Sequence, residues 1–436
     1  LHQDPEEPFR HKTFFEMNHM NIFEVIEFVQ MFGITLVETV FNLTEVQTFL
    51  SENNHFDVVI VEQFVNEAFK AFCYRYGASC ISLSTMPSNR WTNGQVGNPL
   101  NPSYVPDMFT PFSDRMSFLQ RVENTITTTL EMLYHYFYQL PKQDKILRKY
   151  FPKAPSIFDL YHNTSLILLN AHVAINYPVP LVPNMIPIGG YHISPPEGLP
   201  KDIQKYMDDA EDGVIFFSLG SNLQGSDMGE HRINTILNVL KNLKQTILWK
   251  INSDTLSNLP PNVKLSSWFP QQSILAHPNT KLFISHCGLL SVMESIYHGV
   301  PMVTIPIYGD QPMNAVNAMK GGYARTVSFA DLNEENLYNA VHEVLTNPRY
   351  RTSARMRSKM FHDNPMKPLD KAVFWVEYVI RHKGAPHLRT AAASLSWYQC
   401  LLLDVILFII VIILCVLVIL ARIITKLFPK KKDKIC

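Results

Sequence analysis

The chain has 436 residues, which is enough for two domains with sizeable hydrophobic cores. Its formal net charge is zero and no basic stripe precedes the C-terminal tail, so a nucleic acid is not expected as a partner. Among the six cysteines, only Cys73 and Cys80 are candidates for a pair, and two buried free thiols are the favoured interpretation.

The sequence begins unlike a complete secreted or membrane protein. Its first residue is leucine, and residues 1–18 are polar and aromatic, without the apolar stretch of a signal peptide or the pattern of a strand. We therefore expect an N-terminally truncated chain or a fragment.

Helices and strands alternate along the first part of the chain. Segments with apolar residues at helical spacing follow short apolar runs of the buried-strand type. Such alternation is typical of a parallel α/β domain. The predicted elements are helices at 22–31, 44–53 and 66–76 and strands at 57–61 and 80–84.

Two segments of the first half resist a regular assignment. The first is 87–111, which is rich in proline, asparagine, glycine and serine and predicts a long loop; in a compact domain such a loop is usually functional. Regular elements follow it: residues 113–140 predict one or two aromatic-rich helices, and 165–170 predict a further buried strand. The density of proline in 177–200 excludes a regular element there, and we interpret this segment as an interdomain linker.

The second half repeats the alternation. The predicted elements are strands at 214–219, 246–250 and 263–267 and helices at 234–243, 337–346 and 372–382. Residues 220–225 have the glycine spacing of a Walker loop but lack its Gly-Lys-Ser/Thr ending, and no dinucleotide fingerprint is present. The acidic run at 208–212 is interpreted as a solvated helix end, and no Asp-x-Asp motif predicts a metal.

The segment from Trp268 to Gln311 predicts a strand, a turn, a helix and a second strand, and it carries most of the candidate site residues. Its apolar runs at 281–285 and 301–306 predict buried parallel strands, and apolar spacing between them predicts a helix over 288–298. The turn between strand and helix offers free backbone N–H groups and the positive end of the helix dipole, which together form an anion site. Ligands gather at such strand ends in open α/β sheets.

Three residues of this turn and helix suit a phosphate group. Gly288 permits a close approach of the backbone, and His286 and Ser291 can donate hydrogen bonds to phosphate oxygens. Taken alone, His286 also fits a satisfied core histidine. The ordered set favours the binding site.

Further side chains suit the other parts of a nucleotide sugar. Glu294 follows Ser291 by three residues on the helix and suits ribose hydroxyls, and Trp268 offers a flat face for a base, although a packing role is its alternative. Asp310 and Gln311 follow the second strand and could bind sugar hydroxyls.

This stretch resembles the signature of the UDP-glycosyltransferases of family 1. The similarity runs from about Phe56 to the C-terminus and is greatest to the insect membrane-bound branch. It implies an α/β fold of GT-B type, in which two Rossmann-like domains face a cleft, followed by one C-terminal transmembrane helix. It also implies that the last helix of the second domain, 372–382, braces the first domain.

The resemblance implies a role for each matching residue of the donor site. The implied contacts are Trp268 stacking on uracil, Gln271 on the nucleoside, Ser221, His286, Gly288 and Ser291 on the diphosphate, Glu294 on the ribose, and Asp310 and Gln311 on the sugar. Two positions depart from the pattern. Cys287 stands where animal members usually have glycine, and Leu290 replaces an asparagine that could contact phosphate.

The catalytic base is the part that the sequence does not supply. Inverting sugar transfer needs a base on the acceptor hydroxyl, usually a histidine oriented by a carboxylate. Glu62 matches the family's acidic partner, with a solvated strand-end carboxylate as its alternative, but His2, His11 and His19 follow no strand. No base is therefore assigned, and neither a metal nor a cofactor is expected beside the UDP-sugar co-substrate.

The C-terminal region predicts a membrane anchor. Residues 401–421 are nearly all apolar and long enough to span a bilayer, and basic residues follow, so the tail is predicted to be cytosolic. Sequons at Asn42 and Asn163 fit luminal domains and a glycoprotein. The ending at 432–436 resembles a dilysine retrieval signal, with stop-transfer charge as an equal alternative. We expect a single-pass protein of the endoplasmic reticulum membrane.

The predicted domains and function follow from these points. The domains are an acceptor-binding domain at 1–185, incomplete at its start, a UDP-sugar-binding domain at 186–385, a juxtamembrane segment at 386–400, a transmembrane helix at 401–421 and a basic cytosolic tail at 422–436. We expect transfer of a hexose, with glucose favoured, from UDP-sugar to a hydroxyl of a small lipophilic acceptor, with inversion, as in detoxification. The alternative is a catalytically inactive protein that binds UDP-sugar or pairs with a partner. A homo- or hetero-oligomer is left open.

Overall fold

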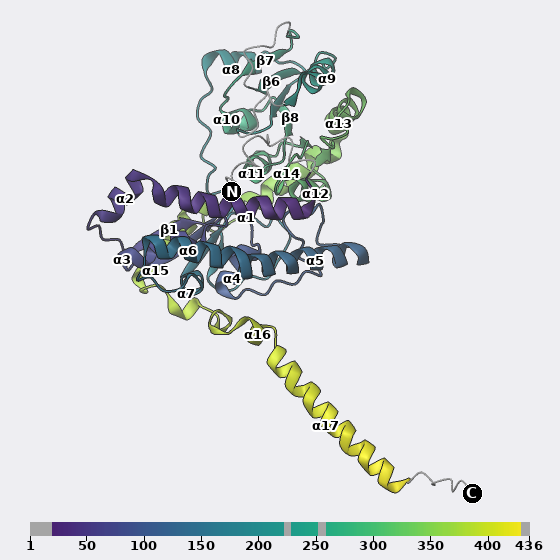
Figure 1. Cartoon of the computed structure of the whole chain (residues 1–436). Helices are drawn as coiled ribbons and strands as arrows, with labels where there is room; N and C mark the ends of the chain where they lie inside the picture. Colours follow the sequence, from purple (N-terminus) through teal and green to yellow (C-terminus); the bar gives the residue numbers. More distant parts are fainter. Residues whose placement is uncertain (1–19, 222–227, 252–258, 429–436) are drawn as a thin grey trace, which may run out of the picture. The chain divides into compact units, whose positions relative to one another are not determined.

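The computed structural model describes residues 20–221, 228–251 and 259–428 (Figure 1). The chain divides into two compact units, Leu1–Arg389 and Thr390–Cys436. His2, His11 and His19, the residues 222–227 of the glycine-rich turn, and the basic ending at 430–436 lie outside the described residues.

The first unit contains two parallel sheets, and the first of them has four strands in the order β1-β2-β3-β4. The strands are β1 (Val58–Glu62), β2 (Ser79–Ser84), β3 (Leu166–Leu169) and β4 (Met185–Pro187). All pair in parallel, as the alternating pattern predicts. β4 is a correction, because it lies in the proline-rich segment and straddles the predicted domain boundary at 185/186. A three-residue strand at a sheet edge tolerates proline, since its outer N–H positions need no partner.

Helices flank this sheet, and most of them match the predicted segments. They are α1 (Ile22–Asn42), α2 (Thr44–Ser51), η2 (Glu67–Lys70), α3 (Ala71–Tyr76), α4 (Arg90–Val96), α5 (Phe118–Tyr134), the π-helical η3 (His135–Gln139), α6 (Leu140–Tyr150) and α7 (Ile157–His162). The helix at Arg90–Val96 is a correction, because it lies inside the segment 87–111 that was predicted to be a loop, and a capping box at Asn89 begins it. α1 is about twice as long as predicted. Its N-terminus is fixed by a capping box at Asn21, and its apolar face continues through the buried Val37 and Phe41.

A disulfide joins Cys73 and Cys80, which corrects the prediction of two free thiols. Cys73 lies on α3, and Cys80 lies on the adjacent strand β2. Gly77, with a φ of 61°, ends α3 in the left-handed conformation and turns the chain back. The resulting Cα separation of 5.5 Å is within the range for a disulfide.

The second sheet has six parallel strands in the order β10-β9-β8-β5-β6-β7. They are β5 (Val214–Ser218), β6 (Thr246–Lys250), β7 (Val263–Ser266), β8 (Thr280–Ser285), β9 (Met302–Thr304) and β10 (Ala324–Thr326). Helices cover both faces, and an apolar core lies on each side of the sheet. The strand order reverses between β5 and β8, which is the topological switch point where ligands bind in such sheets.

The helices of this half include several that the periodicity did not predict. They are α8 (Lys201–Asp208), α9 (Glu230–Leu240), α10 (Gln271–Ala276), α11 (Leu289–Tyr297), α12 (Gln311–Lys320), α13 (Glu334–Thr346), α14 (Pro348–His362) and α15 (Pro368–Arg381), followed by η5 (Pro386–Leu388). The expectation for the last helix is confirmed. Ala372 and Val379 of α15 belong to one apolar cluster with Ile81 and Leu166 of the first sheet.

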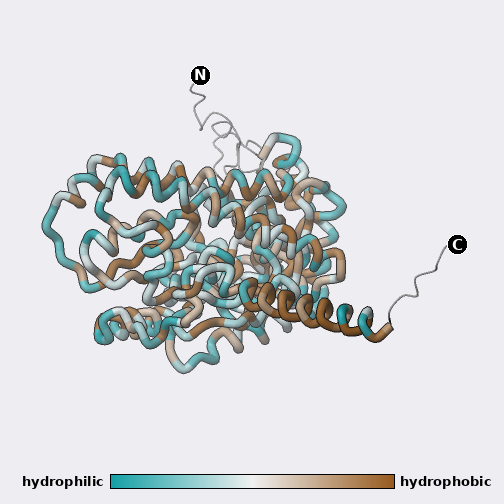
Figure 2. Tube along the Cα trace, turned by 60° about the horizontal axis from the view of Figure 1, so that its bottom comes forward, coloured by the Kyte–Doolittle hydropathy of each residue, from teal (hydrophilic) through white to brown (hydrophobic). Residues whose placement is uncertain are grey.

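The second unit carries a long apolar helix. It contains η6 (Ala391–Ser394), α16 (Trp397–Cys400) and α17 (Leu403–Leu427). α17 has 25 residues with a mean hydropathy of 3.6 in its most apolar window, and none of that window is buried. Figure 2 shows the hydrophobic residues that run along this helix. By length and composition α17 can cross a membrane, and it extends six residues beyond the predicted 401–421.

Candidate functional site

The predicted site residues gather at the carboxyl ends of β5 and β8. These two strands are neighbours in register, with Ser218 opposite Ser285, so the turns that follow them lie side by side. A cavity of about 740 Å³ opens beside these turns. Of the residues that the sequence predicts, it is lined by Ser221, Trp268, Gln271, His286, Gly288, Ser291, Glu294 and Asp310.

His286 is held between two glycines. A Cβ added at Gly288 would lie 2.6 Å from the ring Nε2, and one added at Gly220 would lie 2.8 Å from the ring Cε1. Both positions therefore need glycine because the imidazole fills the space. Burial, with a smaller effect from the charge of Lys250, lowers the pKa of His286 to about 4. The ring is neutral at physiological pH and has one N–H to donate.

The helix after this turn begins without a side-chain cap. Gly288 is the N-cap residue of α11, and within the described part of the chain no side chain caps the first N–H groups of the helix. These groups face the cavity with the positive end of the helix dipole behind them. Cys287 precedes them with a φ of 70°, a conformation rare for residues other than glycine. Its N–H donates to Ser285 Oγ at 3.2 Å, which fixes the turn.

Lys250 is a cavity residue that the sequence analysis missed. It is the last residue of β6, and its Nζ donates to Ser221 Oγ at 2.9 Å. Burial lowers the pKa of Lys250. The sequence shows a lysine at the end of a predicted strand, but only the sheet order places that strand beside β5. The cavity thus has a cation, a neutral imidazole and a free helix N-terminus on one wall.

Glu294 is held by two glutamines. Gln271 Nε2 donates to Glu294 Oε2 at 2.6 Å and Gln272 Nε2 to Oε1 at 3.2 Å. Gln271 Nε2 also donates to Ser291 Oγ at 3.1 Å. His192 Nε2 lies 3.5 Å from Glu294 Oε1, and neither ring nitrogen has another partner among the described residues. The carboxylate is fixed in direction by this shell and opens onto the cavity.

Trp268 and Asp310 line the cavity as predicted, whereas Gln311 does not. Trp268 lines the cavity with 66% of its surface exposed, so its ring face is available. Asp310 also lines the cavity, and burial raises its pKa although Asn314 Nδ2 donates to it at 2.7 Å. Gln311 does not line it. Its Oε1 accepts from the backbone N–H of Ile307 and Tyr308, so it supports the loop that carries Asp310.

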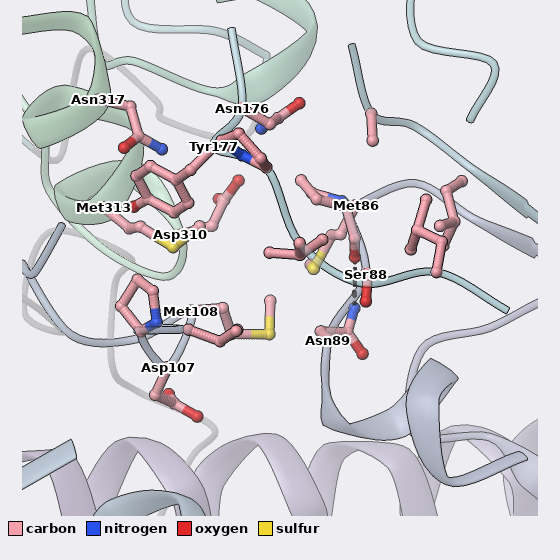
Figure 3. A pocket seen from close by; sticks show the side chains of 18 of the residues that line it. Met86, Ser88, Asn89, Asp107, Met108, Asn176, Tyr177, Asp310, Met313 and Asn317 are labelled. Carbon is pink, nitrogen blue, oxygen red and sulfur yellow. Dashed lines mark hydrogen bonds between the residues drawn. The ribbon is translucent and has the colours of Figure 1, made fainter. Parts of the chain in front are cut away.

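A second cavity has a volume of about 280 Å³. Figure 3 shows side chains that line it. Its wall includes residues of the segment 87–111, which carries α4, and three methionines, Met86, Met108 and Met313. Met86 and Asp310 line both cavities, so the two spaces share a wall. Arg90 and Asp107 on this wall form a buried ion pair, which joins the start of α4 to the loop that follows this helix.

Glu62 lies apart from these residues. It is the last residue of β1, is exposed to solvent and lines neither cavity. Its charge is felt by Tyr191, whose pKa is raised by burial first and by Glu62 second. In the described residues, no group of three or more potential ligands could hold a metal.

Comparison with known proteins gives consistent matches. Residues 4–436 match the family described as UDP-glucoronosyl and UDP-glucosyl transferase. The chain is 39% identical to UDP-glycosyltransferase UGT5 of Dactylopius coccus over 85% of this chain and 71% of that protein. It is 42% identical to UDP-glucosyltransferase 2 of the same organism, over 82% and 69%. For UDP-glucuronosyltransferase 2B7 of Homo sapiens the identity is 36%, over 78% and 64%.

Solved structures show the same fold at low identity. A glycotransferase of kitacinnamycin aligns with a TM-score of 0.57 at 18% identity, covering 83% of this chain and 84% of that one. A UDP-glucosyltransferase from Polygonum tinctorium aligns with a TM-score of 0.55 at 17% identity, covering 82% of each. The two Rossmann-like sheets are therefore arranged as in GT-B proteins, as the sequence predicts.

Proposed function

Because this chain belongs to the UDP-glucoronosyl and UDP-glucosyl transferase family and is a UDP-glycosyltransferase, we propose that the larger cavity binds the UDP-sugar and the smaller one the acceptor. The single observation that carries this division is the wall shared by the two cavities, with Asp310 on both sides of it. A sugar bound at Asp310 in the larger cavity would therefore lie close to the hydroxyl of an acceptor in the smaller cavity.

The diphosphate is proposed to lie at the N-terminus of α11. His286 and Ser291 would donate to its oxygens, and Lys250 would offset its charge together with the helix dipole. Lys250 holds Ser221 in the same wall, so Ser221 would make its contact from a fixed position. These groups also stabilise the charge that develops on the leaving UDP. With this charge met by protein groups, we propose that no metal is required.

The nucleoside is proposed to extend toward Trp268. The exposed indole would stack on uracil, and Glu294 would accept from the ribose hydroxyls in the direction fixed by Gln271 and Gln272. Asp310 would accept from sugar hydroxyls, whereas Gln311 would act through the loop that it holds. Glucose is the favoured sugar because the chain is 42% identical to a protein named as a UDP-glucosyltransferase.

The acceptor is proposed to be a small lipophilic molecule with a hydroxyl group. Methionines on the wall of the smaller cavity adapt to ligands of different shape, and few charged groups compete for the acceptor. In the reaction, the acceptor oxygen attacks the anomeric carbon and loses its proton to a base. The bond from that carbon to the diphosphate breaks with inversion, and UDP leaves with the electron pair. We propose Glu62 as the residue that orients the base.

Localisation is proposed from two further observations. α17 supports a membrane anchor, and the disulfide between Cys73 and Cys80 supports an oxidising compartment for the first unit. Both observations fit a protein of the endoplasmic reticulum membrane whose first unit lies in the lumen. We also propose a role in detoxification. The alternative of an inactive binding protein is not favoured by the matches to proteins named as transferases.

The test separates binding from turnover. The full chain in detergent is titrated with UDP by calorimetry, and UDP release from UDP-glucose is then measured with a phenol or sterol acceptor. UDP binding with acceptor-dependent release supports the proposal. Binding without release supports the inactive alternative, and absence of UDP binding would overturn the site assignment itself.

A further inference from the structure

Helix α5 has the reverse of the polarity that is usual for a helix on a soluble protein. Its buried side chains are all polar, namely Asn124, Thr127, Thr128 and Glu131. Large apolar side chains are exposed instead, between 41% and 75% of their surface, and we call them the outer face of α5. The outer face consists of Leu119, Val122, Ile126, Leu130 and Leu133, with Phe137 of η3.

These residues form one stripe because they are spaced by three or four positions over about five helical turns. The helix cannot roll to bury them, since its polar side is bound. Asn124 Nδ2 donates to the carbonyl oxygens of Pro102 and Val105, and its Oδ1 accepts from the N–H of Asp107 at 2.7 Å. Glu131 Oε1 accepts from Gln30 and Trp91 and lies 2.6 Å from Arg90 Nε. The apolar exposure is therefore built into the fold.

The same helix continues through η3 into α6, where the exposed side becomes basic (Figure 1). Lys142, Lys145 and Lys149 are exposed on α6, and Lys142 Nζ lies 5.3 Å from the ring of Tyr138. An apolar stripe followed by lysines and aromatic rings is typical of helices that lie in the boundary between lipid headgroups and acyl chains. The lysines add attraction to anionic headgroups.

The chain itself keeps this helix close to a bilayer. The connection from Thr390 to Leu402 spans at most roughly 45 Å when fully extended, so a membrane-inserted α17 holds the first unit beside the surface. Tethering makes the contact intramolecular, and a weak surface affinity is then enough. Nothing in the described ranges 20–221, 228–251 and 259–428 covers the outer face.

We propose that the outer face of α5 inserts into the surface of the bilayer that α17 spans, with the lysines of α6 against anionic headgroups. This contact is independent of the chemistry proposed for the cavities. It has a consequence for them, because Thr128 on the inner side of α5 lines the smaller cavity. That cavity would lie one helix diameter, about 10 Å, from the lipid in which lipophilic molecules concentrate.

Photolabelling of the full chain in vesicles tests the proposal. The vesicles contain phosphatidylcholine, a minor share of phosphatidylserine and a lipid with a diazirine in its acyl chain, and labelled peptides are quantified by mass spectrometry. Peptides of α17 serve as the positive control and those of α13 as the background. Because burying one leucine side chain favours lipid by roughly tenfold or more, we expect α5 peptides to be labelled at least about tenfold above α13.

A variant assigns the label to the outer face. Ile126→Glu with Leu130→Glu should reduce labelling of α5 to the level of α13 while α17 remains labelled, because both side chains are exposed and their replacement leaves the core intact. Met356→Glu on α14 is the matched control, since Met356 is also an exposed apolar residue, and it should leave α5 labelling unchanged.

Two results would overturn the proposal. Labelling restricted to α17 would show that lipid does not reach α5. Efficient disulfide crosslinking between two copies that carry Ile126→Cys, together with absent lipid labelling, would assign the outer face to a dimer interface instead. Both readouts are independent of UDP binding and turnover, so they cannot be confused with a failure of the proposed activity.

Discussion

The two halves of the first unit use charged groups in opposite ways. Around the first sheet, charges are buried against each other: Arg90 with Asp107 and Glu131, and Lys70 beside Glu67. At the second sheet, the charged Lys250 lines a cavity, and Ser221 is the partner that its Nζ has among the described residues. The neutral ring of His286 lines the same cavity. The first arrangement stabilises a fold, and the second leaves binding capacity. A lysine therefore belongs to a closed polar network in the first half, at Lys70, and to the wall of an open cavity in the second half, at Lys250.

This difference predicts that stability and UDP affinity respond to different sets of variants. Variants in the buried networks of the first half should change the free energy of unfolding with little effect on UDP affinity in the folded protein. Variants at the cavity wall of the second half should do the reverse. The predictions below test this contrast from the largest expected effect to the smallest.

Glu131→Ala should have the largest effect, on stability. It removes the acceptor of Gln30 and Trp91 and leaves Arg90 with only Asp107 as its anionic partner. Breaking a buried ion pair costs about 3–5 kcal/mol, which denaturant unfolding would measure. Glu123→Ala, at an exposed position of the same helix, is the control and should change stability by less than about 0.5 kcal/mol. An equally small loss for Glu131→Ala would contradict the structural role of the network.

His286→Ala should weaken UDP binding by roughly 10- to 100-fold, because it removes a buried imidazole donor that lines the cavity. Calorimetric titration of the full chain measures the change, and the melting temperature should stay close to that of the parent chain. His342→Ala, an exposed histidine of α13, is the control. Unchanged affinity for UDP in His286→Ala would refute the proposed diphosphate contact.

Lys70 should make the stability of the first half depend on pH. Its Nζ donates to Ser82, Gln95 and Thr164, and burial lowers its pKa from 10.5 to about 7. Between these pH values the unfolded chain binds a proton that the folded chain does not, so stability should rise with pH by up to about 1.4 kcal/mol per pH unit. Unfolding curves at pH 7 to 10 compared with those of Lys70→Met measure this contribution, which the variant should lack. Parallel pH profiles for the two proteins would count against it.

Gln311→Ala should have the smallest effect. Because Gln311 accepts from the N–H groups of Ile307 and Tyr308, its loss loosens the loop before Asp310 and should weaken UDP-sugar binding by about 0.5–1.5 kcal/mol. Gln311→Glu keeps the accepting oxygen and should restore affinity if the role is support of the loop. Failure of the glutamate to rescue would indicate direct contact with the sugar, as the sequence predicts.

That most of the predicted site residues line one cavity could be predicted from the sequence because they are close together along the chain. Trp268 to Asp310 form consecutive strand, turn and helix segments, so their periodicity and order determine where the side chains meet. Lys250 was missed because it reaches the cavity from a strand outside that segment. The pairing of Cys73 with Cys80 depends on how α3 turns into β2, and a count of cysteines carries no such information.

The smaller cavity was harder to predict, because its wall is formed by residues far apart along the chain. Its wall combines the segment 87–111 with residues near 177 and with Met313 from the other half, and only the folded chain brings these together. The polar side of α5 could not be recognised as its buried side, because burial of Asn124 and Glu131 depends on partners far away in the sequence. Glu62 stays a prediction, since the site shows it exposed at the end of β1.

The position of α15 bears on how this protein is made. Ala372 and Val379 complete the apolar cluster over the first sheet, although they follow Ile81 by nearly three hundred residues. A ribosome therefore releases the strands of the first half long before the segment that closes over them. During that interval the nascent chain exposes a patch that chaperones must shield, and translation of the second half sets how long they must do so.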